Sequence, residues 1–207
     1  MPLYKSITVN KHTKVLIWSI EEAEQELHKN ITLTTRCEKR LASTKSEIHR
    51  IGFLTVRQLL KVSGYEAHDL YYDDEGRPHL RDGKKISITH SFTYSGIIIS
   101  SAVVGIDIEK QRDKIKVIAH KFIENERSFI VPENEIQMLT IVWCIKESLY
   151  KAFATAGISF KNHINICPFS IYDNQVHAAV KYNDKQENYE AHFLEFDNFS
   201  CAYALKK

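Results

Sequence analysis

The sequence predicts an α+β protein of two similar subdomains related by pseudo-two-fold symmetry, each a small antiparallel sheet with a long helix. Two observations support this prediction. In each half, apolar residues at helical spacing are followed by short apolar runs between turn residues, the pattern of a helix and an antiparallel meander. No Pro-, Gly- or Ser-rich linker separates the halves. We therefore expect subdomains at 1–104 and 105–207, meeting at Gly105 with a cleft between them.

The first half is expected to contain a strand, two helices and a meander. Residues 13–18 form an apolar strand pattern, and Ser19 followed by Glu22 has capping-box spacing for a helix over about 20–29. A second helix is expected over about 44–63, and Gly64 suits the position after its end. Its residues at helical spacing are Ile48, Ile51, Thr55, Leu59 and Val62. Short strands and turns then follow, at 70–72, 86–90 and 96–104.

The second half repeats this order. A helix is expected near 112–122, and a longer one over about 135–154 is indicated by a dense run of apolar residues. A loop containing Pro132 separates them. Four antiparallel strands are expected at 166–172, 175–182, 188–196 and 199–205.

Composition excludes several classes of protein. The chain has 207 residues, 43% hydrophobic and 26% charged, which is typical of a globular protein and not of a disordered one. Its net charge of +2 argues against a whole-surface binder of polyanions. Four scattered cysteines form no zinc motif, and the longest apolar stretch is shorter than the roughly 20 residues that span a bilayer. A cytoplasmic protein without membrane contact is therefore expected.

Positive charge is nevertheless concentrated in one stretch. Residues 29–61 contain eight Lys and Arg against two Glu, a net charge of +6. This segment would attract an anionic ligand, or it forms a solvated loop and helix face. No aromatic-interleaved basic motif accompanies it, so nucleic acid is not the expected partner.

Two carboxylates lie at the end of a predicted buried strand. Asp107 and Glu109 are two residues apart, so they point to the same face. A hard divalent cation such as Mg²⁺ would relieve their repulsion. The alternative is a strand that ends in solvent, where Lys110 and Arg112 neutralise them.

A third carboxylate lies on the long second-half helix. Trp143, Glu147 and Lys151 are spaced i, i+4 and i+8, which places them along one helix face. Glu147 could complete a three-carboxylate metal site, and Lys151 could meet a phosphate oxygen. The alternative is a Glu–Lys surface pair worth a few tenths of a kcal/mol.

Two further motifs offer phosphate donors. Ser87, Thr89 and Ser91 alternate on one strand face with His90 opposite, and Arg77 lies in a turn fixed by its Gly and Pro neighbours. The alternatives are a strand end that bonds local backbone and a plain hairpin with an exposed arginine.

Together, the order and spacing of four motifs resemble the 4′-phosphopantetheinyl transferases, specifically the monomeric, two-subdomain Sfp-type branch. The motifs are Gly76-Arg77-Pro78, Ser87-Ile88-Thr89-His90-Ser91, Gly105-Ile106-Asp107-Ile108-Glu109 and the segment from Trp143 to Lys151. The resemblance implies an enzyme of the holo-carrier-protein synthase type. Such an enzyme transfers the 4′-phosphopantetheine arm of coenzyme A to a serine hydroxyl of an acyl or peptidyl carrier protein and releases adenosine 3′,5′-bisphosphate.

The resemblance also implies roles for individual residues. Mg²⁺, with Mn²⁺ as an alternative, would be held by Asp107, Glu109 and Glu147. Coenzyme A phosphates would be contacted by Lys151, Arg50, Arg77, Ser87, His90 and Ser91. The expected catalytic residues are Asp107, Glu147, Lys151 and, as the base, Glu126. Two departures from the family pattern are noted. Thr89 stands where the family usually has Ser, and in one of two possible registers Arg127, not Glu126, occupies the position of the family's glutamate.

Two other functions are left open. A non-catalytic homologue would bind coenzyme A or a carrier protein without transfer, and a phosphate-binding nucleic-acid module would use residues 29–61. The intact set of three carboxylates and Lys151 favours the enzyme. We expect a monomer with coenzyme A and an apo carrier protein as partners, and neither nucleic acid nor membrane.

Overall fold

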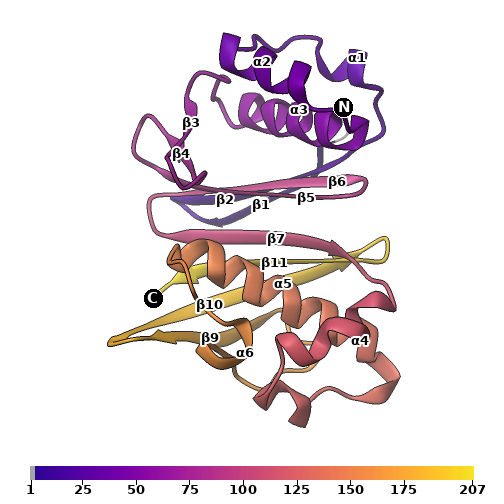
Figure 1. Ribbon diagram of the computed structural model, residues 1–207, viewed down its shortest axis with the longest axis vertical. Coiled ribbons are helices and arrows are strands. Elements are labelled where there is room, and N and C mark those ends of the chain that lie inside the picture. The colour runs from indigo at the N-terminus through magenta and orange to yellow at the C-terminus, as the bar shows by residue number, and fades with distance from the viewer. Residues whose placement is uncertain (1–2) are drawn as a thin grey trace. The chain divides into compact units, whose positions relative to one another are not determined.

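The computed structural model describes residues 3–207, which fall into two compact units (Figure 1). They are Met1–Ser101 and Ala102–Lys207, whereas the sequence placed the division between 104 and 105. Each unit contains one antiparallel sheet and its own helices, so the predicted α+β class is confirmed. The roles expected of the two subdomains stay predictions: coenzyme A phosphate contacts for 1–104, and the Mg²⁺ carboxylates and catalytic helix for 105–207.

The first unit contains a six-stranded antiparallel sheet in the order β1-β2-β6-β5-β4-β3. Its strands are β1 (Leu3–Asn10), β2 (Thr13–Ser19), β3 (Leu70–Tyr72), β4 (Pro78–Leu80), β5 (Lys85–Ser91) and β6 (Tyr94–Ser100). Apolar side chains of β2, β5 and β6 pack against one helix face and form the core of this unit.

Three helices lie on one side of that sheet (Figure 1). They are α1 (Glu24–Leu27), α2 (Thr35–Ser43) and α3 (Glu47–Val62). Helix α3 packs Val56, Leu59 and Leu60 onto the sheet. It ends as predicted, because Gly64 adopts a φ of 84°, which costs glycine little.

The second unit contains a five-stranded antiparallel sheet in the order β7-β11-β10-β9-β8. Its strands are β7 (Val104–Lys110), β8 (Ile164–Ile166), β9 (Gln175–Tyr182), β10 (Lys185–Phe196) and β11 (Phe199–Lys206). The helical segments are α4 (Lys114–Ile118), η1 (Ala119–Lys121), η2 (Asn125–Ser128), η3 (Pro132–Asn134), α5 (Glu135–Phe153) and α6 (Phe160–His163).

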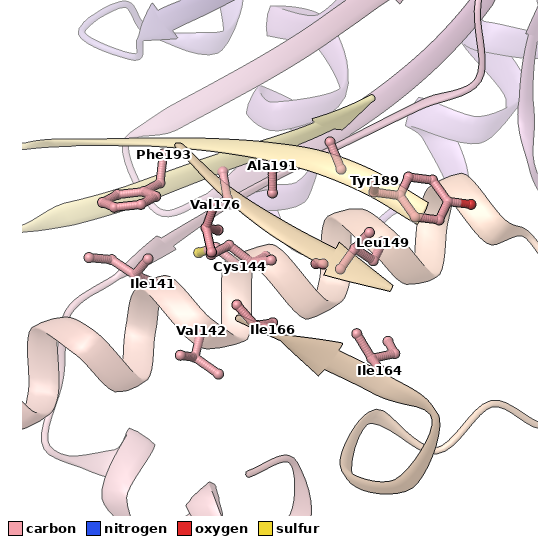
Figure 2. Close-up of a cluster of buried hydrophobic side chains, with 14 of the residues drawn as sticks. Ile141, Val142, Cys144, Leu149, Ile164, Ile166, Val176, Tyr189, Ala191 and Phe193 are labelled. Carbon is pink, nitrogen blue, oxygen red and sulfur yellow. The ribbon is translucent and has the colours of Figure 1, made fainter. Parts of the chain in front are cut away.

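Helix α5 provides most of the core of the second unit. Figure 2 shows its side chains Ile141, Cys144 and Leu149 facing residues of β8, β9 and β10. Such burial contributes about 1.5–3 kcal/mol per large apolar side chain. The helix is therefore held rigidly against the sheet, which fixes the positions of its polar residues.

Several predicted elements differ from the structure. The helix expected over 20–29 is only one turn long, and Glu22 accepts a hydrogen bond from the Trp18 indole instead of capping a helix. The continuous strand expected over 96–104 is broken after Ser100, and its two parts belong to different sheets. The strand expected over 166–172 ends at Ile166.

No helix in the described range 3–207 combines the length and the apolar character needed to cross a bilayer.

Candidate functional site

Gly105 allows β7 and α5 to approach each other closely. A Cβ at this position would lie 1.9 Å from the carbonyl oxygen of Ser148 and 3.2 Å from the amide nitrogen of Ala152. Both are backbone atoms of α5, so they cannot rotate away. Because side chains alternate along a strand, Asp107 and Glu109 point to the same side as Gly105, toward α5.

Lys151 of α5 forms an ion pair with Asp107 of β7. Its Nζ donates to Asp107 Oδ1 at 2.8 Å and to the carbonyl oxygen of Ile106 at 2.9 Å. The Asp107 side chain is only 7% exposed and that of Lys151 29% exposed. Burial alone would lower the pKa of Lys151, but Asp107 and Glu147 raise it above its usual value. Lys151 is therefore a fixed positive charge, which is paired with Asp107.

Glu147 lies near both β7 carboxylates. Burial, with the negative charges of Asp107 and Glu109, raises the pKa of Glu147 to about 7, and Lys151 opposes this rise. Burial together with Asp107 and Glu109 also raises the pKa of the Cys144 thiol. Asp107, Glu109 and Glu147 thus form one group of interacting charges, which we call the carboxylate cluster.

The donor types of the carboxylate cluster fit a hard divalent cation. All three side chains offer oxygen, the ligand atom that Mg²⁺ prefers, and their mutual repulsion would be relieved by bound positive charge. Across residues 3–207, no three His, Cys, Asp or Glu side chains converge as a formed metal site. In the structure, the ammonium group of Lys151 supplies positive charge next to Asp107. The three-ligand Mg²⁺ site stays a prediction.

Glu126, the predicted base, is buried inside the second unit. Its side chain is 1% exposed and lies 2.8 Å from Nζ of Lys146, whose side chain is 0% exposed. The other Glu126 contacts are hydrogen bonds from the backbone N–H groups of Ile166 and Glu124. Lys146 also donates to the carbonyl oxygens of Phe160 and Ile164. These contacts hold η2, α6 and β8 against α5, so they stabilise the fold of the second unit.

The first unit contains a pocket of about 400 Å³ that is lined by two arginines and two histidines. Its lining residues are Arg40, Thr44, His49, Gly52, Phe53, Val56, Arg57, Tyr72, Ile88, Thr89 and His90. In the part of the chain that the structure describes, neither Arg40 nor Arg57 forms an ion pair. We call this feature the cationic pocket.

Arg57 is the most unusual residue of the cationic pocket, because it is 4% exposed and its Nε has no hydrogen-bond partner among the described residues. Its guanidinium lies 3.4 Å from the centroid of the Phe53 ring. Arg40 lies over both Phe53 and Tyr72, at 5.3 and 5.5 Å from the ring centroids. A buried cation without a paired anion is costly, so this pocket is suited to an anionic ligand.

The predicted phosphate contacts are distributed over several positions in the first unit. His90 lines the cationic pocket, whereas Ser87 and Ser91 are buried on β5 and, by strand alternation, point to its other face. Arg77 is an exposed residue of the turn before β4, where its N–H donates to Asp73. Arg50 donates from Nε and Nη2 to Glu24 and from Nη1 to the carbonyl oxygens of Thr44 and Lys45, so its guanidinium is engaged in local structure.

Sequence reasoning did not assign Arg40, Thr44, His49 or Arg57 individually. The signal was present as the net charge of +6 over residues 29–61. That count did not show which cations are paired and which line a pocket.

Two comparisons define the class of this protein. A sequence model of the 4′-phosphopantetheinyl transferase superfamily matches residues 103–204. This match bears out the predicted resemblance to the superfamily over those residues. A curated relative, the 4′-phosphopantetheinyl transferase gsp of Aneurinibacillus migulanus, is 26% identical over 160 residues, which cover 73% of this chain. The matched region spans only 65% of that relative's length.

Proposed function

We propose that this protein transfers the 4′-phosphopantetheine arm of coenzyme A to a serine hydroxyl of an acyl or peptidyl carrier protein. The carboxylate cluster with Lys151 is the observation that carries this proposal, because phosphoryl transfer depends mainly on positioning and on neutralising oxygen charge. The match of residues 103–204 to the superfamily model and the similarity to a named phosphopantetheinyl transferase support it.

In the proposed reaction, the serine oxygen forms a bond to the β-phosphorus of coenzyme A. The bond between this phosphorus and the bridging oxygen breaks, and adenosine 3′,5′-bisphosphate leaves with that oxygen. The serine proton passes to a carboxylate oxygen of the cluster. Lys151 binds a phosphate oxygen and stabilises the charge that develops on the leaving group.

Asp107, Glu109 and Glu147 would hold Mg²⁺ or Mn²⁺. When bound, this ion would neutralise the pyrophosphate and make its phosphorus more electrophilic. Glu126 is left out of the proposed reaction, because a carboxylate that is 1% exposed and paired with Lys146 is not accessible to a protein substrate.

The cationic pocket would bind the phosphate-rich end of coenzyme A. Arg40 and Arg57 supply positive charge, and His49 and His90 supply ring nitrogens that can donate to phosphate. Arg77, Ser87 and Ser91 remain proposed phosphate contacts, whereas the Arg50 guanidinium is held by Glu24. We propose that the chain acts as a monomer whose partners are coenzyme A and an apo carrier protein, and that it binds neither nucleic acid nor membrane.

Calorimetry and a transfer assay test this function together. Wild-type protein is expected to bind coenzyme A and to modify an apo carrier protein, and Asp107→Ala and Glu147→Ala are expected to fold without detectable transfer. The exposed residues Asp184 and Glu133 provide matched controls as Asp184→Ala and Glu133→Ala. Unchanged transfer in both cluster variants would contradict the site. Binding without transfer in the wild type would support the non-catalytic alternative.

A further inference from the structure

Gly52 lies in the interior of α3, where glycine is an unfavourable residue. The helix runs from Glu47 to Val62, and alanine would stabilise such a position relative to glycine. Gly52 is not needed for a turn, because positive φ angles among the described glycines occur elsewhere. Its presence therefore calls for a reason in the packing around the helix.

The reason is the imidazole ring of His90. A Cβ at Gly52 would lie 2.4 Å from Cδ2, 3.0 Å from Nε2 and 3.1 Å from Cγ of His90. Favourable contacts between carbon atoms occur at about 3.5–4.0 Å, so any side chain at this position would displace the ring. On the same helix, His49 packs edge-on against His90, with ring centroids 5.9 Å apart.

Glycine at position 52 leaves room for the His90 ring at the wall of the cationic pocket, where His49 packs against it. Gly52, His49 and His90 all line that pocket together with Arg40 and Arg57. A ring nitrogen held there can donate to a phosphate oxygen beside two arginines that form no ion pair with described residues.

We propose that Gly52 is a positioning residue that sets the His90 imidazole for contact with a phosphate monoester of the substrate. This inference rests on the proposed function, in which that group is the 3′-phosphate of coenzyme A. Gly52 acts only through His90 and makes no contact with the reacting atoms.

The displaced atoms belong to a side chain, so Gly52→Ala is expected to fold. Rotation of His90 can relieve the contact, and the higher helix propensity of alanine favours α3. Stability and substrate binding should therefore change in different ways: the melting temperature is unchanged or higher, while phosphate recognition is weaker.

The test compares Gly52→Ala with Ile48→Ala, an exposed position on the same helix, each in the wild-type and His90→Ala backgrounds. Dissociation constants are measured for coenzyme A and for 3′-dephospho-coenzyme A. In the wild-type background, Gly52→Ala is expected to weaken coenzyme A binding by about tenfold, a typical loss for one charge-assisted hydrogen bond. Binding of the dephosphorylated compound should be unchanged, and Gly52→Ala should have no further effect in the His90→Ala background.

A second readout does not depend on substrate. Imidazole resonances of His90 in the free protein, assigned by comparison with His90→Ala, should shift in Gly52→Ala and not in Ile48→Ala. Unchanged resonances would overturn the proposal, as would an equal loss of affinity in both backgrounds. A wild-type protein that binds no coenzyme A would overturn the proposed function and, with it, the role of Gly52.

Discussion

The ammonium group of Lys151 lies 2.8 Å from a carboxylate oxygen of Asp107 and 2.9 Å from the carbonyl oxygen of Ile106. This pair joins α5 to β7 at the centre of the carboxylate cluster. Lys151 partly offsets the repulsion among three carboxylates, so one side chain has both a structural effect and a proposed part in the reaction.

Substitution of Lys151 is expected to affect stability in a Mg²⁺-dependent way. Lys151→Met leaves Asp107, which is 7% exposed, without this cation, so the melting temperature should fall in chelator. Mg²⁺ bound to the cluster would supply the missing charge and should restore part of the loss. Transfer should fall about 10²–10³-fold, because one donor to the transition state is removed.

Lys161→Met is the control for this experiment, because Lys161 forms a partly exposed pair with Glu124 away from the cluster. Its melting temperature should not depend on Mg²⁺ beyond the wild-type response. If the melting temperature of Lys151→Met does not change on addition of Mg²⁺, metal binding by the carboxylate cluster is contradicted.

Gly105→Ala is expected to be severely destabilising. The new Cβ would lie 1.9 Å from a backbone oxygen of α5, so the helix itself would have to move. We expect a loss of about 3 kcal/mol or more in the free energy of unfolding, measured by urea denaturation. Gly52→Ala is a useful comparison, because its clash is with a side chain. Equal stability of the two variants would contradict this account of the β7–α5 contact.

The buried pair of Lys146 and Glu126 is expected to stabilise the second unit without taking part in the reaction. Lys146→Met should cost about 3–5 kcal/mol, since it leaves a carboxylate that is 1% exposed without its cation. The double variant Lys146→Met/Glu126→Gln should be more stable than Lys146→Met alone. Glu126→Gln should retain transfer with an unchanged pH profile, and loss of the acidic limb of that profile would instead identify Glu126 as the base.

Acid should weaken the contact between α1 and α3. The hydrogen bond from Arg50 lowers the pKa of Glu24 below its usual value, so its contribution to stability is present above the unfolded pKa of about 4.5. That contribution is lost as the pH falls through the lower, folded-state pKa. Glu24→Gln should therefore show a smaller loss of stability below pH 4.5 than the wild type in urea titrations. Glu26→Gln, in the same helix, should behave as the wild type; a Glu24→Gln curve parallel to the wild-type curve would refute the assignment.

Elements with strong local patterns could be predicted from the sequence. Helix α5 has a long apolar pattern with few interruptions, and β9 is bounded by turn residues; both match their expected ranges closely. The break between β6 and β7 could not be predicted, because an apolar run reads as one strand even where the chain leaves one sheet and enters another. Helix α1 was predicted too long. The spacing of Ser19 and Glu22 matched a capping box, but Glu22 accepts a hydrogen bond from Trp18 instead.

The site was predictable where residues are close in sequence. The spacing of Asp107 and Glu109 placed them on one strand face, and the spacing of Glu147 and Lys151 placed them on one helix face. Contacts between distant segments were not predictable. The burial of Glu126 depends on Lys146, twenty residues further along, and the Arg50–Glu24 pair joins residues 26 apart.

The most direct test of the central claim is the intact mass of an apo carrier protein after incubation with this protein, coenzyme A and Mg²⁺. We predict a mass increase equal to one phosphopantetheine arm, release of one adenosine 3′,5′-bisphosphate per carrier, and loss of both products on chelation. Carrier proteins of fatty-acid, polyketide and nonribosomal-peptide synthesis that all keep their apo mass, while coenzyme A binds to the protein, would contradict the proposed transfer.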